Sequence, residues 1–375
     1  MEKFTEEFEK KFEKEYERIE KNIKKPNILL VGGTGVGKSS LVNHIFGEKV
    51  AEVGRGEPVT KSLNKYENSN LPVVLYDTKG YEIGTNKQKE FLNEVVNYAL
   101  ESRKNVKNSI HLVWYFIDAS SHRITDLDIK IIKKIYNENI PISILFTKSD
   151  LVSKSEIEEL EKKVKNILPN LKTFRITTID IPSLDYLDVN KLIKWSIDKL
   201  PEGLKYGFIK AQKRNLEEKK KKAKNIILQH TTGSGVVGFT PIPFSDSPVL
   251  LANEAAMYAR VANVYNVKKL FKNIENMFTS VGVGSLISKS GIYTVGQLLK
   301  VIPVGGQIVG GMISASVAAS ITAALGFSIS ELFYRISKHT LEGNEDELKD
   351  IFENIEKILK NLFNDYFQKE KERSR

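Results

Sequence analysis

The stretch Asn27-Ile-Leu-Leu-Val-Gly-Gly-Thr-Gly-Val-Gly-Lys-Ser39 decides the fold, because it joins a short apolar strand to a glycine-rich loop and the start of a helix. Residues 32–39 match the pattern G-x-x-x-x-G-K-[ST]. In such a loop the backbone N–H groups turn toward phosphates, the ammonium of Lys38 reaches the β- and γ-phosphates, and the hydroxyl of Ser39 ligates Mg²⁺. A chance glycine turn is disfavoured by the preceding strand. The predicted phosphate site comprises Gly32, Gly33, Thr34, Gly35, Val36, Gly37, Lys38, Ser39 and Ser40.

Around this loop, β-branched runs alternate with amphipathic stretches. The alternation predicts an α/β domain with a mostly parallel sheet covered by helices. The expected strands are residues 27–31, 73–77, 110–117, 141–146 and 172–177, and the expected helices are residues 88–102, 126–137, 155–167 and 188–200.

Two further segments fit the ligation of a triphosphate and its metal. Asp77-Thr-Lys-Gly80 ends an expected strand and has the form D-x-x-G, in which the carboxylate holds Mg²⁺ through water and the glycine N–H contacts the γ-phosphate. Its position at the carboxyl end of a strand, after the phosphate loop, is where ligands bind in open α/β sheets. Thr60 lies between the two motifs, where a mobile loop would bring a hydroxyl to the metal. We therefore predict that Ser39, Thr60 and Asp77 hold Mg²⁺.

A third motif selects the base. Thr147-Lys148-Ser-Asp150 follows another expected strand and fits the form [NT]-K-x-D. In this form the lysine stem packs on the base, and the carboxylate accepts the N1–H and the exocyclic amine of guanine, a donor pair that adenine lacks. The alternative role of Asp150 is that of a helix N-cap. A last contact to the guanine edge is expected near Thr177, after the final strand.

This ordered set of residues resembles the Era/septin branch of the translation-factor-class P-loop GTPases over most of residues 25–200. The resemblance implies a Ras-like G domain that binds GTP or GDP with Mg²⁺ and hydrolyses GTP, with Lys38, Thr60 and Gly80 as catalytic residues. Further likeness lies in residues 58–60, 110–117, 120–121 and 126–128, and the segments 238–246 and 252–267 resemble the hydrophobic helical C-terminal domain of bacterial members.

Two positions depart from related patterns. Tyr81 stands where Ras-like proteins have a glutamine that orients water, and a phenol ring cannot replace that amide, so we expect slow intrinsic hydrolysis. Gly35 stands where potassium-activated Era-type proteins have asparagine. The missing positive charge is therefore expected from a partner, from a second copy of the chain, or from Arg55.

The chain divides into an amphipathic N-terminal helix (residues 1–24), the G domain (25–200) and an all-α hydrophobic domain (201–375) that ends in an amphipathic segment, residues 345–367. The first of these carries one aromatic-rich stripe, which is expected to pack on the same protein rather than on a partner. There is no cysteine and no secretory pattern at the N-terminus, and the sequence predicts a cytoplasmic protein.

The remaining expectations concern partners. Residues 301–330 carry no charge and are long enough to enter a membrane, and the protein would then lie at its inner face. The alternative is that they form a soluble helical core. The lysines within 219–224 either contact acidic headgroups or form a solvated face. With 57 Lys and Arg against 47 Asp and Glu, the net charge of +10 also suits RNA or a ribosome, although the tail lacks a KH signature. Three functions stay open: a switch that controls dimerisation or membrane association of the tail, a ribosome- or RNA-associated GTPase, and a scaffold that barely hydrolyses GTP.

Overall fold

The computed structural model describes residues 2–47, 57–60, 63–67, 71–78, 87–104, 108–179, 188–232, 248–268, 270 and 315–373. The chain separates into two compact units. The first unit is Ile23–Asn215, and the second unit combines Met1–Asn22 with Leu216–Arg375. The first unit is therefore inserted between the N-terminal helix and the remainder of the helical unit.

A seven-stranded sheet forms the centre of the first unit, and its order is β2-β3-β4-β1-β5-β6-β7. The five strands from β4 to β7 run parallel, whereas β2 and β3 are antiparallel at one edge. This arrangement confirms the predicted mostly parallel sheet. The strands are β1 (Asn27–Val31), β2 (Glu57–Thr60), β3 (Leu63–Glu67), β4 (Val74–Thr78), β5 (Leu112–Asp118), β6 (Ile142–Thr147) and β7 (Lys172–Arg175).

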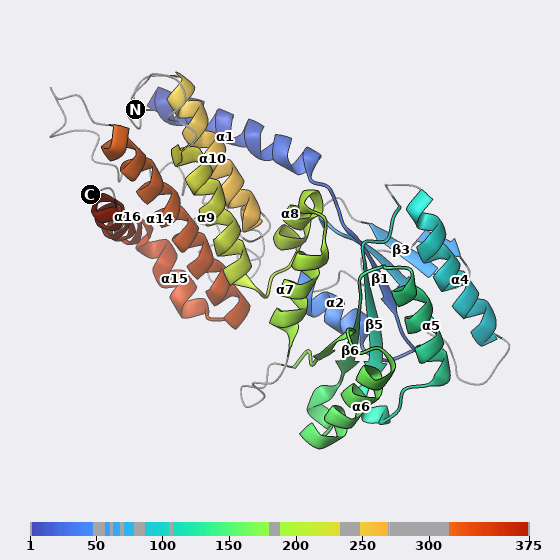
Figure 1. Ribbon diagram of the computed structural model, residues 1–375. Helices are drawn as coiled ribbons and strands as arrows, with labels where there is room; N and C mark the ends of the chain where they lie inside the picture. The colour runs from blue at the N-terminus through green and yellow to red at the C-terminus, as the bar shows by residue number, and fades with distance from the viewer. Residues whose placement is uncertain are drawn as a thin grey trace. The chain divides into compact units, whose positions relative to one another are not determined.

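Helices cover both faces of this sheet (Figure 1). Successive side chains of β5 point to opposite faces: Tyr115 belongs to the cluster formed with α4, α5 and α6, whereas Trp114 stacks on Phe46 of α2 and meets Phe208 of α8. The indole N–H of Trp114 donates to Ser196 of α7. The helices are α2 (Lys38–Phe46), α4 (Lys87–Glu101), α5 (Asp126–Asn137), α6 (Lys154–Ile167), α7 (Val189–Lys199) and α8 (Glu202–Ala211), with the short 3-10 helices η1 (Ser102–Lys104), η2 (Ala119–Ser121) and η3 (Ser149–Leu151).

The first unit extends beyond Leu200, where the sequence marks a boundary. Helix α8 continues it, because Phe208 is fully buried against Phe46 and Trp114. Gly207 lets the same helix pack closely on the backbone before β1, since an added Cβ would meet the carbonyl oxygen of Lys24 at 2.5 Å. Pro201 therefore begins a helix of the same unit instead of ending the unit.

The second unit consists of helices. Its N-terminal helix packs on α10 through an aromatic contact between Phe8 and Tyr258 at 5.6 Å and an ion pair between Glu15 and Arg260. The stripe on this helix thus packs within the same chain. The helices are α1 (Glu2–Asn22), α9 (Leu216–Thr232), α10 (Pro248–Val264), α14 (Ala315–Glu342), α15 (Glu345–Glu353) and α16 (Ile355–Arg373).

Helix α14 lies at the centre of this unit and contacts α9, α10 and α16. It includes residues 315–330 of the uncharged segment, whereas residues 301–314 lie outside the described residues. The amphipathic segment after Glu345 is two helices, α15 and α16, separated at Asn354. Within the ranges that the structure describes, no helix combines the length and apolar character needed to cross a bilayer.

Candidate nucleotide-binding site

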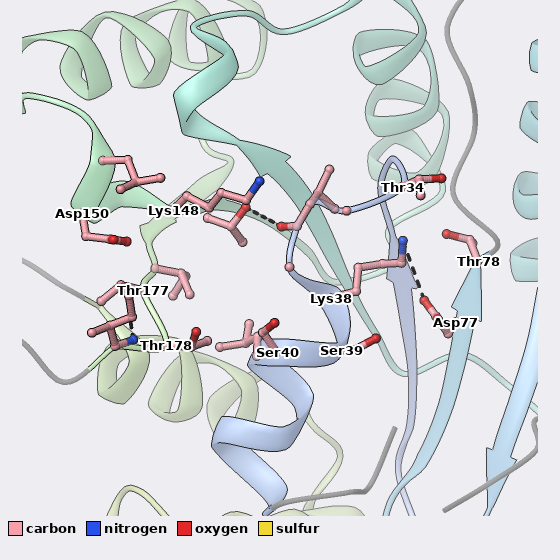
Figure 2. A pocket seen from close by; sticks show the side chains of 18 of the residues that line it. Thr34, Lys38, Ser39, Ser40, Asp77, Thr78, Lys148, Asp150, Thr177 and Thr178 are labelled. Atoms are coloured by element: carbon pink, nitrogen blue, oxygen red, sulfur yellow. Dashed lines mark hydrogen bonds and ion pairs between the residues drawn. The ribbon is translucent and has the colours of Figure 1, made fainter. Parts of the chain in front are cut away.

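A pocket of about 580 Å³ opens at the carboxyl ends of the parallel strands. Figure 2 shows Lys38, Ser39 and Asp77 at one end of it and Asp150 with Thr177 and Thr178 at the other. The two ends match the two halves of a nucleotide, the phosphates and the base. The pocket is lined by Thr34, Gly35, Val36, Gly37, Lys38, Ser39, Ser40, Leu41, Asn64, Asp77, Thr78, Thr147, Lys148, Asp150, Leu151, Ile176, Thr177, Thr178 and Ile179.

The phosphate end is built by the turn from β1 to α2. The buried ammonium of Lys38 donates to the carbonyl oxygens of Gly32 and Gly33, both at 3.0 Å, and lies 4.0 Å from Asp77 Oδ1. Burial lowers the pKa of Lys38, and the carboxylate of Asp77 partly offsets that shift. Gly32 and Gly33 do not line the pocket. They hold the lysine at its edge.

Two glycines of this loop are required by the backbone. An added Cβ at Gly32 would lie 2.7 Å from the carbonyl oxygen of Phe116 in β5, closer than any side chain can approach. Gly37 has a φ of +93°, a left-handed conformation that glycine adopts readily. Gly32 is therefore required by the packing of the loop on the sheet, and Gly37 by the backbone conformation of the loop.

The metal predicted from the sequence fits the donors at this end. Among the described residues, the buried Oδ1 of Asp77 has no hydrogen-bond partner. Burial raises the pKa of Asp77 to about 6, against the opposing effect of Lys38. A buried carboxylate oxygen beside the Ser39 hydroxyl offers the oxygen ligands that Mg²⁺ prefers, with room for metal-bound water. The donor set therefore suits Mg²⁺.

The base end is joined directly to the phosphate loop. The hydroxyl of Thr147 donates to the carbonyl oxygen of Val36 at 2.6 Å, which fixes the distance between the loop and the base motif. Lys148 has a φ of +53°, and its ammonium donates to Asp118 Oδ2 at 2.5 Å. Burial raises the pKa of Asp118, but hydrogen bonds from Lys148 and Ser120 outweigh it and leave the pKa below its usual range. Asp118 thus positions the lysine stem.

The loop that carries Asp150 is tied to the end of β7. The Ser149 hydroxyl donates to the Phe146 carbonyl oxygen at 2.6 Å, and the Ser149 N–H donates to the Ile176 carbonyl oxygen at 3.1 Å. Leu151 and Ile179 line the same end and are 66 % and 59 % exposed. Large exposed aliphatic side chains beside a carboxylate and an ammonium suit the faces of a planar base.

The structure brings together most of the predicted site residues, but Thr60 is not among the pocket-lining residues. It ends β2, and its hydroxyl donates to Glu94 of α4 at 3.3 Å. Gly80 lies outside the described residues, as do Tyr81 and Arg55. The pocket is also lined by residues that the motifs did not indicate, namely Asn64, Leu41, Leu151, Ile176 and Ile179. Asp118, another residue outside the motifs, does not line the pocket but accepts a hydrogen bond from Lys148.

A lysine-bearing glycine loop between β1 and α2, in a sheet with this strand order, defines a P-loop G domain. Residues 27–148 match the family described as 50S ribosome-binding GTPase, and residues 208–362 match a family described as domain of unknown function (DUF697). The probable GTP-binding protein EngB of Lactobacillus gasseri is 32% identical over 177 residues, which cover 47% of this chain and 88% of that protein. The chain therefore belongs to the EngB/Era-like family of P-loop GTPases, and the predicted family is confirmed.

Two further proteins match a smaller share of their own length. Septin-8-A of Danio rerio is 30% identical over 165 residues, covering 38% of this chain and 39% of the septin. A crystal structure of a point variant of Aquifex aeolicus Era bound to GDP·AlF4⁻ is 22% identical and has a TM-score of 0.33, and the match covers 48% of this chain and 58% of the Era chain. The similarity to these two proteins is thus confined to part of each chain.

Proposed function

We propose that this protein binds GTP and GDP with Mg²⁺, hydrolyses the γ-phosphate of GTP, and uses the nucleotide state as a switch. One observation carries the proposal: a single pocket joins the ammonium of Lys38 and the buried carboxylate of Asp77 to the carboxylate of Asp150. The first two groups suit a metal-bound polyphosphate. The third, beside Lys148, suits the paired N–H donors of guanine.

Each side chain has a role in this proposal. Lys38 neutralises charge on the β- and γ-phosphates, while Ser39 and Asp77 hold the metal directly and through water. When bound there, Mg²⁺ would supply positive charge that offsets the negative charge developing during phosphoryl transfer. Thr60 and Gly80 complete the phosphate end only in the triphosphate state. Thr177 and Thr178 lie at the guanine edge.

The contact between Thr60 and Glu94 supports the switch. In the described structure this hydroxyl is engaged by a carboxylate of α4 and not by the pocket. A GTPase in its diphosphate state holds the corresponding loop away from the metal, and the γ-phosphate then recruits it. We therefore assign the described arrangement to the open state of the switch.

The output of the switch is proposed to pass to the helical unit, through dimerisation or association with a membrane surface. The support is covalent: the first unit is joined to the second at both of its ends, before Ile23 and after Asn215. Sedimentation velocity and liposome flotation, each with GTPγS and with GDP, test this output. Identical sedimentation and flotation in the two nucleotide states would contradict this proposed output.

A ribosome-associated GTPase is the second candidate, because the family matching residues 27–148 is described as 50S ribosome-binding and the chain carries a net charge of +10. Phosphate contacts make such binding salt-dependent. Cosedimentation with 50S subunits that requires GTPγS and disappears at high salt would favour this candidate over the first.

Calorimetry with Asp150→Asn tests the base assignment. Asparagine cannot accept both guanine donors, and hydrogen bonds to a charged group contribute about 1.5–3 kcal/mol each, so GTP affinity should fall at least ~10-fold while XTP affinity rises. Asp126→Asn, an equal charge change at an exposed position on α5, serves as the control. Unchanged GTP preference in Asp150→Asn contradicts the assignment. Single-turnover hydrolysis separates a slow enzyme from a GTP-binding scaffold.

A further inference from the structure

A second pocket, of about 350 Å³, lies entirely within the helical unit. Its walls come from the three helices α9, α14 and α16, and both α9 and α16 pack on α14. Neither the phosphate loop nor the base motif contributes to it. The lining residues are Glu217, Lys220, Lys221, Lys224, Phe327, Ser330, Glu331, Tyr366, Lys369, Glu370 and Arg373.

Each of the three carboxylates that line this pocket already interacts with a neighbouring side chain. Glu331 accepts from Lys220 at 2.9 Å, Glu370 from Arg373 at 2.8 Å, and Glu217 from the Tyr334 hydroxyl at 2.8 Å. These pairs neutralise two of the pocket's cations. The Tyr334 hydroxyl is neutral and leaves the charge of Glu217 in place, so the five cations of the lining exceed its three carboxylates by two.

The remaining cations are Lys221, Lys224 and Lys369, and all three are exposed. Within the ranges that the structure describes, Lys221 and Lys224 form no ion pair. Lys369 lies over the ring of Tyr366, with its ammonium 5.2 Å from the ring centroid. Three ammonium groups on two helices therefore border one cavity without a carboxylate of their own.

The floor of the pocket is aromatic. The rings of Phe327 and Tyr366 lie 5.5 Å apart and are tilted by 30°, and both side chains are partly buried. A flat apolar group can pack on such a pair, and a cluster of lysines binds phosphate oxygens as point charges. The volume lies near the lower end of the range for small-ligand sites, about 300–1,000 Å³.

We propose that this pocket binds a small phosphate monoester that carries a flat ring, such as an aryl or nucleoside phosphate. The ring packs on Phe327 and Tyr366, and the phosphate lies among Lys221, Lys224 and Lys369. The site is distinct from the nucleotide pocket of the G domain. Its residues on α9 and α14 lie in the region matched by the domain of unknown function, residues 208–362, whereas Tyr366, Lys369, Glu370 and Arg373 on α16 follow that region.

Calorimetry on the full chain, with the G domain saturated by GDP and Mg²⁺, tests the proposal with phenyl phosphate as the probe. We expect saturable binding of one equivalent, with inorganic phosphate and phenol each binding at least about fivefold more weakly. The double variant Lys221→Gln/Lys224→Gln should weaken binding by about 25-fold, since an exposed ion pair contributes up to a factor of about five.

The matched control is Lys162→Gln/Lys163→Gln, which removes two consecutive exposed lysines from α6 in the other unit and should leave the affinity unchanged. Tyr366→Leu keeps an apolar side chain but removes one of the two rings, and should reduce the preference for phenyl phosphate over inorganic phosphate. Thermal melting confirms that each variant is folded. The proposal is overturned by an absence of saturable binding or by equal losses in the two lysine pairs.

Discussion

Replacing Glu94 by alanine tests the switch most directly, because Glu94 is the residue that holds the hydroxyl of Thr60 in the described structure. Alanine removes the acceptor and preserves the helical propensity of α4. If Thr60 must leave this carboxylate when GTP binds, the hydrogen bond is lost on GTP binding and kept on GDP binding. It therefore weakens the affinity for GTP only. Its loss should then strengthen GTP-analogue binding and leave GDP binding unchanged.

The magnitude follows from the geometry of the contact. A hydrogen bond to a charged acceptor contributes about 1.5–3 kcal/mol in favourable cases. The oxygens are 3.3 Å apart, beyond the usual separation for O–H···O bonds, and the pair is only partly buried. We therefore assign it about 1 kcal/mol, which corresponds to about a fivefold rise in the ratio of GTPγS affinity to GDP affinity.

Calorimetric titration of GTPγS and of GDP, each with Mg²⁺, measures this ratio. Glu90→Ala, which removes an exposed carboxylate one turn earlier on α4, is the control and should not change it. Thr60→Ala should lower the ratio, and Glu94→Ala should have no further effect in that background. A ratio that falls or stays constant in Glu94→Ala refutes the proposed release of Thr60.

Three further predictions concern packing and titration. Gly32→Ala forces a Cβ to within 2.7 Å of the Phe116 carbonyl oxygen, so we expect a loss of about 1–3 kcal/mol in unfolding free energy and weaker GDP binding, measured by thermal melting and calorimetry. Gly203→Ala, in helix α8 with open space around it, is the control and should lower neither stability nor GDP affinity. Burial holds the pKa of His111 below its usual value, so the stability from its neutral form is present above about pH 6.5 and decreases as the pH falls, and His111→Gln should flatten that dependence in denaturant titrations. Phe8→Ala empties a fully buried position and should cost the helical unit about 3–5 kcal/mol in denaturant unfolding; an unchanged midpoint contradicts the packing of α1.

The parallel strands and their helices could be predicted because local signals agree with the tertiary structure. The helix expected at residues 126–137 is observed with those bounds, since Thr125 and Asp128 form a capping box at its start. Strands β2 and β3 were not predicted. They are short and lie at the antiparallel edge, and β3, with the sequence Leu-Asn-Lys-Tyr-Glu, has neither a continuous apolar run nor a regular apolar–polar alternation, so their signal is weak.

The residues of the site could likewise be predicted only where a local sequence pattern indicates them. Motif spacing indicated Lys38, Asp77 and Asp150, because each follows a strand in a known pattern. Asp118 and Asn64 belong to no motif, and they reach the site only through strand pairing. Asp118 lies opposite Thr147 in the register of β5 and β6, and Asn64 lies opposite Asp77 in that of β3 and β4. Such residues could be found from sequence only if that register were known.

The insertion of the first unit between α1 and α9 couples nucleotide binding to the helical unit even without a contact between the units. If the first unit unfolds, roughly 190 residues of disordered chain separate Asn22 from Leu216. Closing such a loop costs about 4–5 kcal/mol by the logarithmic dependence on length, and this cost opposes the packing of α1 on α10. A nucleotide bound at a hundred times its Kd stabilises the first unit by about 2.7 kcal/mol, so it also protects the docking of α1. The packing of the aromatic stripe of α1 on α10 is therefore the contact whose free energy depends on whether the G domain is folded.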